Sequence, residues 1–209
     1  DEDPLRLLRA VRFSAQLNFS IEEETQHSIE RQAAKLQKIS RERIRDEMNK
    51  LLLSPHPARG IDLLVQLGLV EWIMPEVLEL RGVSQQPLPK APHSKDVYAH
   101  VLRVVERSSP RLVTRWSALL HDIAKPRTKS VEDGKVHFFG HEDVGAYMAR
   151  DILKRLHFDR DFIESVSRIV RLHMRANAYA TEWTDGAVRR LMIEIGNDLD
   201  DLLDLSRAD

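Results

Sequence analysis

Along most of the chain, apolar residues recur at three- and four-residue intervals, the spacing of helices that bury one face. No segment shows the sustained alternation of apolar and polar residues that predicts a strand. We therefore expect an all-α protein, with helices at about residues 3–17, 22–36, 40–52 and 57–67, a short one ending near 78, and others at 96–107, 110–123, 142–156, 160–173, 185–195 and 199–208.

Residues that typically start and stop helices support these bounds. Pro4 stands at a first helical position, where a missing N–H costs nothing, and Ser40 is a typical N-cap. Gly68 is a typical glycine at a helix C-terminus. In the first helix, the spacing points four residues toward the core: Leu5, Leu8, Phe13 and Ala15.

The helical pattern is interrupted between Arg81 and Lys95. Pro87, Pro89 and Pro92 cannot continue a helix, so we interpret 81–95 as a linker between a first block, 1–80, and a second block, 96–209. A second interruption, 125–139, is polar and includes Asp133-Gly134, a turn signal, so we expect a loop there.

Composition excludes some classes of protein. The 209 residues are 31% charged with a net charge of −1, which argues neither for nor against a nucleic-acid partner. The lack of cysteine excludes disulfides and thiolate zinc sites and fits the cytoplasm. No apolar run approaches the roughly 20 residues of a membrane span, and no signal peptide is present, so we expect no membrane partner. Because the sequence begins and ends inside helical patterns, we expect it to be a piece of a longer protein.

A His-Asp pair, His121-Asp122, ends the apolar run 116–120. Such a pair often occurs by chance, but other His and Asp residues stand in or beside separate predicted helices, where a bundle could bring them together. They are His100, His141, at a loop edge, His173 and Asp209. Imidazole and carboxylate are ligands that Mn, Fe, Co, Ni or Zn accept together. The pattern therefore predicts a metal centre.

The order of these residues, and the segment 118–126 around the pair, resemble the HD superfamily of metal-dependent phosphohydrolases. Ala124 stands where many relatives have Gly. The resemblance implies that His100, His121, Asp122 and a late Asp bind a divalent metal (Mn, Co, Ni, Fe or Mg) that activates a water for attack on phosphorus. We favour Asp209 over Asp204 as the late ligand.

Three other residues of the second block have roles that stay open. His141 and His173 could complete a second metal position or contact the phosphate. Lys125, on the predicted loop after the pair, could pair with an anionic substrate as part of the catalytic set with His121 and Asp122. It could equally be a cation favoured by the dipole at a helix C-terminus.

The first helix carries a second unusual pattern. Arg6, Arg9 and Arg12 recur every three residues and so form a ridge, with Asp3 a neighbour of Arg6. A solvated basic stripe with a capping Asp explains this pattern. Alternatively, Asp and Arg side by side could read the hydrogen-bonding edge of a base.

The stretch 2–13, continued by 17–19 and 39–44, resembles the neck of bacterial tRNA nucleotidyltransferases and poly(A) polymerases, the CCA-adding family. The resemblance implies that Asp3 and Arg6 select the incoming nucleotide base, with Glu2 and Arg9 in support. Many members carry an HD domain after the neck and body. The implied architecture is a helical neck and body followed by an HD-type bundle, and the implied partners are nucleotides and the 3′ end of tRNA or another RNA.

The family's catalytic head is missing from these residues. It needs a Gly-Ser loop with two metal-binding carboxylates and an Arg-Arg-Asp motif, and none occurs here; the acidic run 198–201 lacks the Gly-Ser lead-in. We expect the head to precede Asp1, so that this chain alone adds no nucleotides. Two other interpretations remain: a free-standing HD nucleotide phosphohydrolase, or a catalytically silent HD module that serves RNA binding or dimerisation.

Overall fold

The computed structural model describes residues 3–84, 96–179 and 183–209. The first block contains α1 (Leu5–Leu17), α2 (Glu23–Gln32), the 3₁₀ helix η1 (Ala33–Lys38), α3 (Arg41–Leu52), α4 (Pro57–Gln66), η2 (Val70–Trp72) and α5 (Glu76–Glu79). The second contains α6 (Val97–Arg107), α7 (Leu112–Leu120), α8 (Lys125–Thr128), β1 (Ser130–Glu132), β2 (Lys135–His137), α9 (His141–Arg155), α10 (Arg160–Asn177), α11 (Asp185–Ile195), η3 (Gly196–Asp198) and α12 (Leu199–Ala208).

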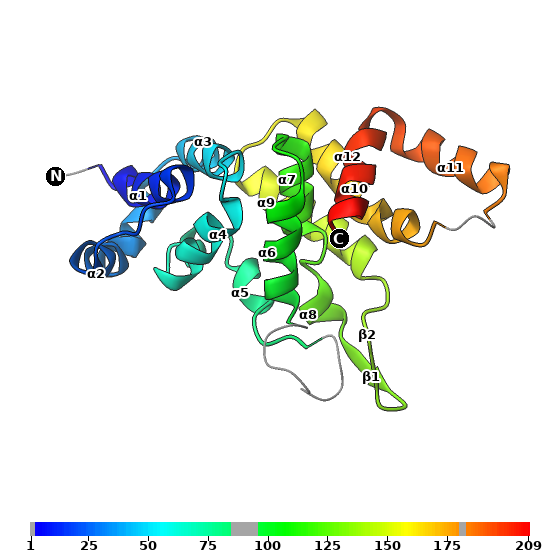
Figure 1. Cartoon of the computed structure of the whole chain (residues 1–209), viewed down its shortest axis with the longest axis horizontal. Coiled ribbons are helices and arrows are strands. Elements are labelled where there is room, and N and C mark those ends of the chain that lie inside the picture. The colour runs from blue at the N-terminus through cyan, green and yellow to red at the C-terminus, as the bar shows by residue number, and fades with distance from the viewer. Residues whose placement is uncertain (1–2, 85–95, 180–182) are drawn as a thin grey trace.

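The molecule is elongated, and the chain runs from one end to the other. Figure 1 shows α1 to α4 at one end, α6 and α7 in the middle, and α11 at the opposite end. The chain then returns through α12, so that Asp209 lies near the middle, beside α6 and α10. Helices therefore dominate the structure, as the apolar spacing predicts.

The two blocks share a continuous hydrophobic core, whose buried residues come from both. Trp116 of α7 is fully buried, and its indole N–H donates to Asn49 of α3 at 2.8 Å. Contacts at the surface add further links: His157 Nδ1 lies 2.7 Å from Glu42 Oε1, and Arg155 pairs with Glu76 at 2.8 Å. Helix α7, which leads into the His-Asp pair, is thus held against the first block through Trp116.

Two expectations about the fold are wrong. The predicted loop 125–139 contains the short helix α8 and an antiparallel hairpin, in which Val131 pairs with Val136. Its turn is Asp133-Gly134, both with positive φ (50° and 71°), as the favoured two-residue hairpin turns require. The second error is Phe13, which is 48% exposed rather than in the core. It lies on the solvent face of α1, because Leu7, Leu8, Val11 and Ala15 define the buried face.

Three helix ends also differ from the expected bounds by three residues or more. The predicted helix 110–123 ends at Leu120, before the His-Asp pair. The predicted helix 22–36 changes at Ala33 to a 3₁₀ helix that runs to Lys38, and α10 continues past His173 to Asn177. Residues 85–95 of the predicted linker lie outside the described part of the chain. Among the described residues, no helix has both the length and the apolar character needed to cross a membrane.

Candidate metal centre

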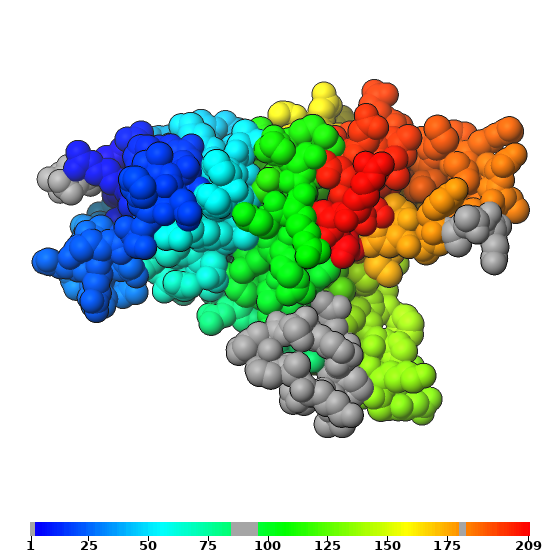
Figure 2. All heavy atoms as spheres, viewed as in Figure 1, coloured from blue at the N-terminus to red at the C-terminus, as the bar shows by residue number. Residues whose placement is uncertain are grey.

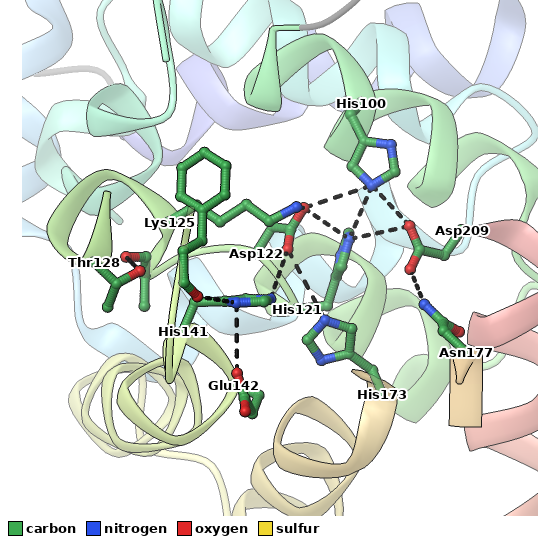
Figure 3. A network of polar contacts seen from close by, with 12 residues as sticks. His100, His121, Asp122, Lys125, Thr128, His141, Glu142, His173, Asn177 and Asp209 are labelled. Atoms are coloured by element: carbon green, nitrogen blue, oxygen red, sulfur yellow. Dashed lines mark hydrogen bonds and ion pairs between the residues drawn. The ribbon is translucent and has the colours of Figure 1, made fainter. Parts of the chain in front are cut away.

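Five separate elements of the second block bring the predicted His and Asp residues together (Figure 3). They are α6, the turn that follows α7, the first turn of α9, the last part of α10, and the end of α12. We call the set the six-residue cluster: His100, His121, Asp122, His141, His173 and Asp209. His141, expected at a loop edge, is the first residue of α9.

Four donor atoms form the first half of the cluster. His100 Nε2 lies 3.2 Å from His121 Nε2, 2.8 Å from Asp209 Oδ1 and 3.5 Å from Asp122 Oδ2. His121 Nε2 lies 3.3 Å from Asp122 Oδ2 and 3.8 Å from Asp209 Oδ1. Atoms that share one ion at the usual bond lengths of about 2.0–2.2 Å stand roughly 3–4 Å apart, so these spacings suit one metal.

The other oxygen of Asp122 belongs to the second half. Asp122 Oδ1 lies 3.5 Å from His141 Nε2 and 4.0 Å from His173 Nε2. Asp122 Oδ1 and His141 Nε2 are buried without a hydrogen-bond partner among the described residues. Buried polar atoms are rarely left unpaired, which fits a position for a cation between them. Asp122 thus faces both halves of the cluster with one carboxylate.

The main chain orients three of the four imidazoles. Nδ1 of His121 lies 2.8 Å from the carbonyl oxygen of Ala118, and Nδ1 of His173 lies 2.6 Å from that of Val170. His141 makes the same contact with the carbonyl of Phe138, at 2.7 Å. In each case the acceptor is three residues earlier, so Nδ1–H donates and the Nε2 lone pair points into the cluster. Metal-binding histidines commonly use their second nitrogen in this way.

The charges of the cluster are coupled. Burial alone would raise the pKa of Asp122, but the nearby His121 and Lys125 outweigh it and hold that pKa well below its usual range. Asp209 is also partly buried, yet the hydrogen bond from His100 and the charge of His121 lower its pKa to about 2. Burial lowers the pKa of His173 to about 4. Both carboxylates are therefore ionised and His173 is neutral near pH 7, the forms in which these groups bind metals.

The burial of these side chains defines the open side of the cluster. His121, Asp122 and His173 are at most 1% exposed, whereas His100 is 17% and Asp209 is 14% exposed. Lys125, the first residue of α8 rather than a loop residue, is 12% exposed, and its Nζ lies 2.7 Å from Asp122 Oδ2. Among the described residues of the cluster and its surroundings, the more exposed side is therefore that of His100, Asp209 and Lys125.

The two candidates for the late acidic residue occupy different places. Asp209 contacts His100 as described, whereas Asp204 Oδ2 lies 3.1 Å from a guanidinium nitrogen of Arg111. Asp204 therefore belongs to the contact between α12 and the start of α7. The positions favour Asp209 as the late ligand.

The sequence did not reveal two residues beside the cluster. The side-chain amide of Asn177 donates to Asp209 Oδ2, and the hydroxyl of Ser206 donates to the Asn177 side-chain oxygen at 2.6 Å. Asn177 is one turn after His173 in α10, so both side chains lie on one face. The apolar spacing predicts a helix that ends at His173, so it does not place Asn177 on this face.

The three residues predicted to contact nucleotides lie at the start of α1, far along the molecule from α12. Asp3 accepts a hydrogen bond from the Leu5 backbone N–H at 3.1 Å and pairs with Arg43 at 2.5 Å, and both contacts lower its pKa. Arg6 and Arg9 are exposed, and Arg9 Nε lies 3.8 Å from Glu47. Glu2, the supporting residue, lies outside the described residues.

Two family models match the chain. Residues 18–80 match "Probable RNA and SrmB-binding site of polymerase A", and residues 91–208 match the HD domain. The second match covers more than half of the sequence and includes the entire six-residue cluster except Asp209. The matched segments occur in the order that the sequence motifs predict.

Curated relatives match along most or all of the chain. An A-adding tRNA nucleotidyltransferase from Deinococcus radiodurans is 36% identical over 99% of this chain and 49% of its own length. A CC-adding tRNA nucleotidyltransferase from Thermus thermophilus is 35% identical over 100% of this chain and 49% of its own length. A multifunctional CCA protein from Azoarcus is 34% identical over 82% of this chain and 42% of its own length. The chain thus spans about half the length of the curated relatives it matches. From these matches and the two motifs, we conclude that the chain belongs to the tRNA nucleotidyltransferase and poly(A) polymerase family and carries an HD domain of the metal-dependent hydrolase type.

Proposed function

We propose that residues 96–209 form a metal-dependent phosphohydrolase, a phosphatase or phosphodiesterase, in a protein that handles the 3′ end of tRNA or another RNA. The convergence of the six-residue cluster from five elements carries this proposal. Three imidazoles aimed by main-chain carbonyls and two ionised carboxylates form a preorganised donor set for a divalent cation. The HD-domain match supports the same chemistry.

The donors favour a transition metal over Mg²⁺, because imidazole suits Mn, Fe, Co, Ni and Zn whereas Mg²⁺ prefers oxygen. His100, His121, Asp122 and Asp209 would hold the first ion, and Asp122 with His141 and His173 would hold a second ion or the substrate phosphate. A bound divalent ion supplies positive charge that polarises a phosphoryl oxygen and lowers the pKa of a water.

The protein's own groups have separate tasks in this reaction. Lys125 neutralises Asp122 from the open side, where it can exchange this contact for an anionic phosphate. The near-complete burial of His121 and His173 excludes bulk water from the far side of the cluster. On this proposal, the substrate phosphate approaches past His100 and Asp209, the more exposed ligands.

A hydrolysis assay tests this proposal. With added Mn, Co or Ni, the protein should release phosphate from a phosphomonoester or open a nucleoside 2′,3′-cyclic phosphate, and EDTA should abolish both reactions. His121→Ala and Asp122→Ala should lose bound metal, measured by elemental analysis, and lose activity while keeping their helical circular dichroism. Asp200→Ala, an exposed acidic residue outside the cluster, is the matched control. Full metal content in both cluster variants would exclude this metal site, and metal binding without any hydrolysis would favour a silent HD module.

We also propose that Asp3 and Arg6, supported by Arg9, select the nucleotide base in a full-length protein of this family. Their place at the start of α1 and the similarity to A-adding and CC-adding enzymes support this assignment. The contact of Arg43 with Asp3 holds the carboxylate in one orientation.

Nucleotide incorporation by the full-length protein tests these roles. Arg6→Ala and Asp3→Ala should change which nucleotide is added more than how tightly RNA binds, because removal of one base-edge contact costs about 1–3 kcal/mol of discrimination. A uniform loss with CTP, ATP, GTP and UTP would instead assign Arg6 to phosphate binding or helix stability. The 209-residue chain itself should incorporate no nucleotide.

A further inference from the structure

Helix α8 connects the His-Asp pair with the hairpin, and no buried side chain anchors it. It is a single turn, Lys125–Thr128, and none of these four described residues is buried. The hairpin that follows projects from the body of the molecule (Figures 1 and 2), and its residues 131–135 are exposed. Because a single helical turn has few hydrogen bonds of its own, the orientation of α8 depends on the contacts of its side chains.

Two cations of α8 contact different parts of the molecule. Lys125, its first residue, points to the six-residue cluster, where its Nζ lies 2.7 Å from Asp122 Oδ2 (Figure 3). Arg127, two residues later, contacts Glu79, the last residue of α5 in the first block. Helix α8 therefore connects the candidate metal centre with the first block.

Arg127 and Glu79 contact each other at two points. Arg127 Nε donates to Glu79 Oε2 at 2.9 Å, and Arg127 Nη2 donates to Glu79 Oε1 at 2.7 Å. A guanidinium and a carboxylate joined in this way fix an orientation as well as a distance. These hydrogen bonds lower the pKa of Glu79, so its carboxylate is ionised near pH 7. The pair thus restricts how α8 can turn.

Helix α5 is a firm support for this pair. Val77 and Leu80 are fully buried in the shared core, so packing sets the position of α5. A second carboxylate of α5, that of Glu76, pairs with Arg155 at 2.8 Å. Arg155 is the last residue of α9 and lies about 20 Å along that helix from its first residue, His141. The two carboxylates of α5 therefore hold different helices of the second block, and Glu79 holds the helix of Lys125.

We propose that the first block regulates the phosphate-binding side of the candidate metal centre through Glu79, a positioning residue for Lys125. The pair of Glu79 with Arg127 holds α8 in the orientation that directs Lys125 toward the cluster, so that a phosphate meets a cation already in place. Without the pair, α8 must be ordered when phosphate binds, which weakens the affinity. The inference rests on the role proposed for Lys125 in binding phosphate.

Hydrogen exchange in EDTA, without metal or substrate, tests the hold on α8. The backbone N–H groups of Arg127 and Thr128 donate to the carbonyl oxygen of Ala124, so their exchange rates, followed by NMR, report the opening of α8. Glu79→Gln keeps the size of the side chain and removes its charge. It should speed both rates about 2- to 5-fold, the range that an exposed ion pair supports.

Glu76→Gln is the matched control for this measurement. Glu76 acts on Arg127 by charge, whereas its hydrogen bond goes to Arg155. Glu76→Gln should therefore leave the exchange of α8 unchanged if the two-point contact, rather than nearby negative charge, holds this helix. Equal exchange rates in Glu79→Gln and the wild type would overturn the proposal.

Phosphate binding by the metal-loaded protein tests the effect on Lys125. In Glu79→Gln, the dissociation constant of inorganic phosphate, measured by calorimetry, should rise about 2- to 5-fold, and metal content should stay unchanged. The KM of a phosphomonoester should rise by the same factor with kcat unchanged, because Lys125 binds the phosphate alike before and during the reaction. Glu76→Gln should keep the wild-type values.

A second substitution distinguishes positioning from a merely structural pair. In a Lys125→Met background, Glu79→Gln should cause no further loss of phosphate affinity, because the positioned cation is gone. Exchange of the two charges, Glu79→Arg with Arg127→Glu, should restore an affinity close to that of the wild type. A loss that persists without Lys125, or a loss of bound metal in Glu79→Gln, would contradict the positioning role. A wild type that binds phosphate but hydrolyses no ester would remove the proposed reaction, while the phosphate affinities would still support the role of Glu79.

Discussion

Asp209 is the residue of the candidate metal centre that a side-chain amide from another helix orients. Main-chain carbonyls orient three of the four histidines, whereas Asp209 follows α12 and is held by the side chains of His100 and Asn177. Because Asn177 occupies Oδ2, it turns Oδ1 toward His100 and His121. Asn177 is therefore a positioning residue, and Ser206 in turn holds Asn177.

The variant Asn177→Ala tests this role. Metal affinity should fall about 10- to 100-fold, as is typical when a group that orients a ligand is removed, while thermal stability without metal changes little. Calorimetric titration with Mn or Co gives the affinity, and an unchanged value would show that Asp209 is positioned by His100 alone. Asn197→Ala, an exposed asparagine of η3, is the control.

At the scale of single residues, the sequence predicts the candidate metal ligands but not the side chains that contact them. The order of His and Asp in separate helices, together with the family resemblance, was enough to select the six-residue cluster. Asn177 and the contact of Lys125 with Asp122 could not be predicted, because they depend on where a helix ends and how a side chain turns. The local spacing of residues determines neither the end of a helix nor the orientation of a side chain.

Elements differ in how well the sequence predicts them. Helices of nine or more residues, such as α6, α9 and α10, show several turns of apolar spacing and were predicted. The strands β1 and β2 have three residues each, which is too short for alternation to be recognised, so only their turn was predicted. The apolar character of Phe13 predicts burial, but Phe13 lies outside the buried face of α1, which Leu7, Leu8, Val11 and Ala15 define.

Gly60 shows how closely three helices of the first block approach one another. A Cβ added at this residue of α4 would stand 2.8 Å from the Leu51 side chain of α3 and 3.1 Å from Ala15 of α1. Since both neighbours are buried, the helices would have to separate.

We expect Gly60→Ala to lower the free energy of unfolding by about 1–3 kcal/mol, the usual cost of overpacking a core. Gly186→Ala, in the first turn of α11, meets only ordinary contacts at 3.6 Å or more and should be neutral or stabilise by up to ~1 kcal/mol. Urea unfolding of both variants gives the comparison. Equal effects would mean that α4 has room to move at Gly60.

For the whole molecule, direct contacts connect the candidate metal centre with the first block. The cluster joins elements from α6 to α12, and α7, which leads into the His-Asp pair, is fixed to α3 through Trp116 and Asn49. The sequence predicted two blocks and a linker but not this contact, because a pairing of residues 67 positions apart leaves no local pattern.

Metal binding should therefore stabilise both blocks together. At 100 times the dissociation constant, a ligand specific for the folded state adds about 2.7 kcal/mol. Hydrogen exchange should then slow in α3 and α4 as well as in α7 and α10 when Mn or Co is added. Protection confined to the second block would show two units that unfold independently, and Asp122→Ala should show no protection in either.

The position of Asp209 also bears on how fast a bound metal could leave. The other five residues of the cluster lie on or beside other helices, so a local detachment of α12 would move Asp209 alone. Each such detachment would remove one ligand and expose the ion to solvent beside His100. The residence time of the metal would then follow the opening rate of this one helix, so a chelator should extract it at a rate that becomes independent of chelator concentration.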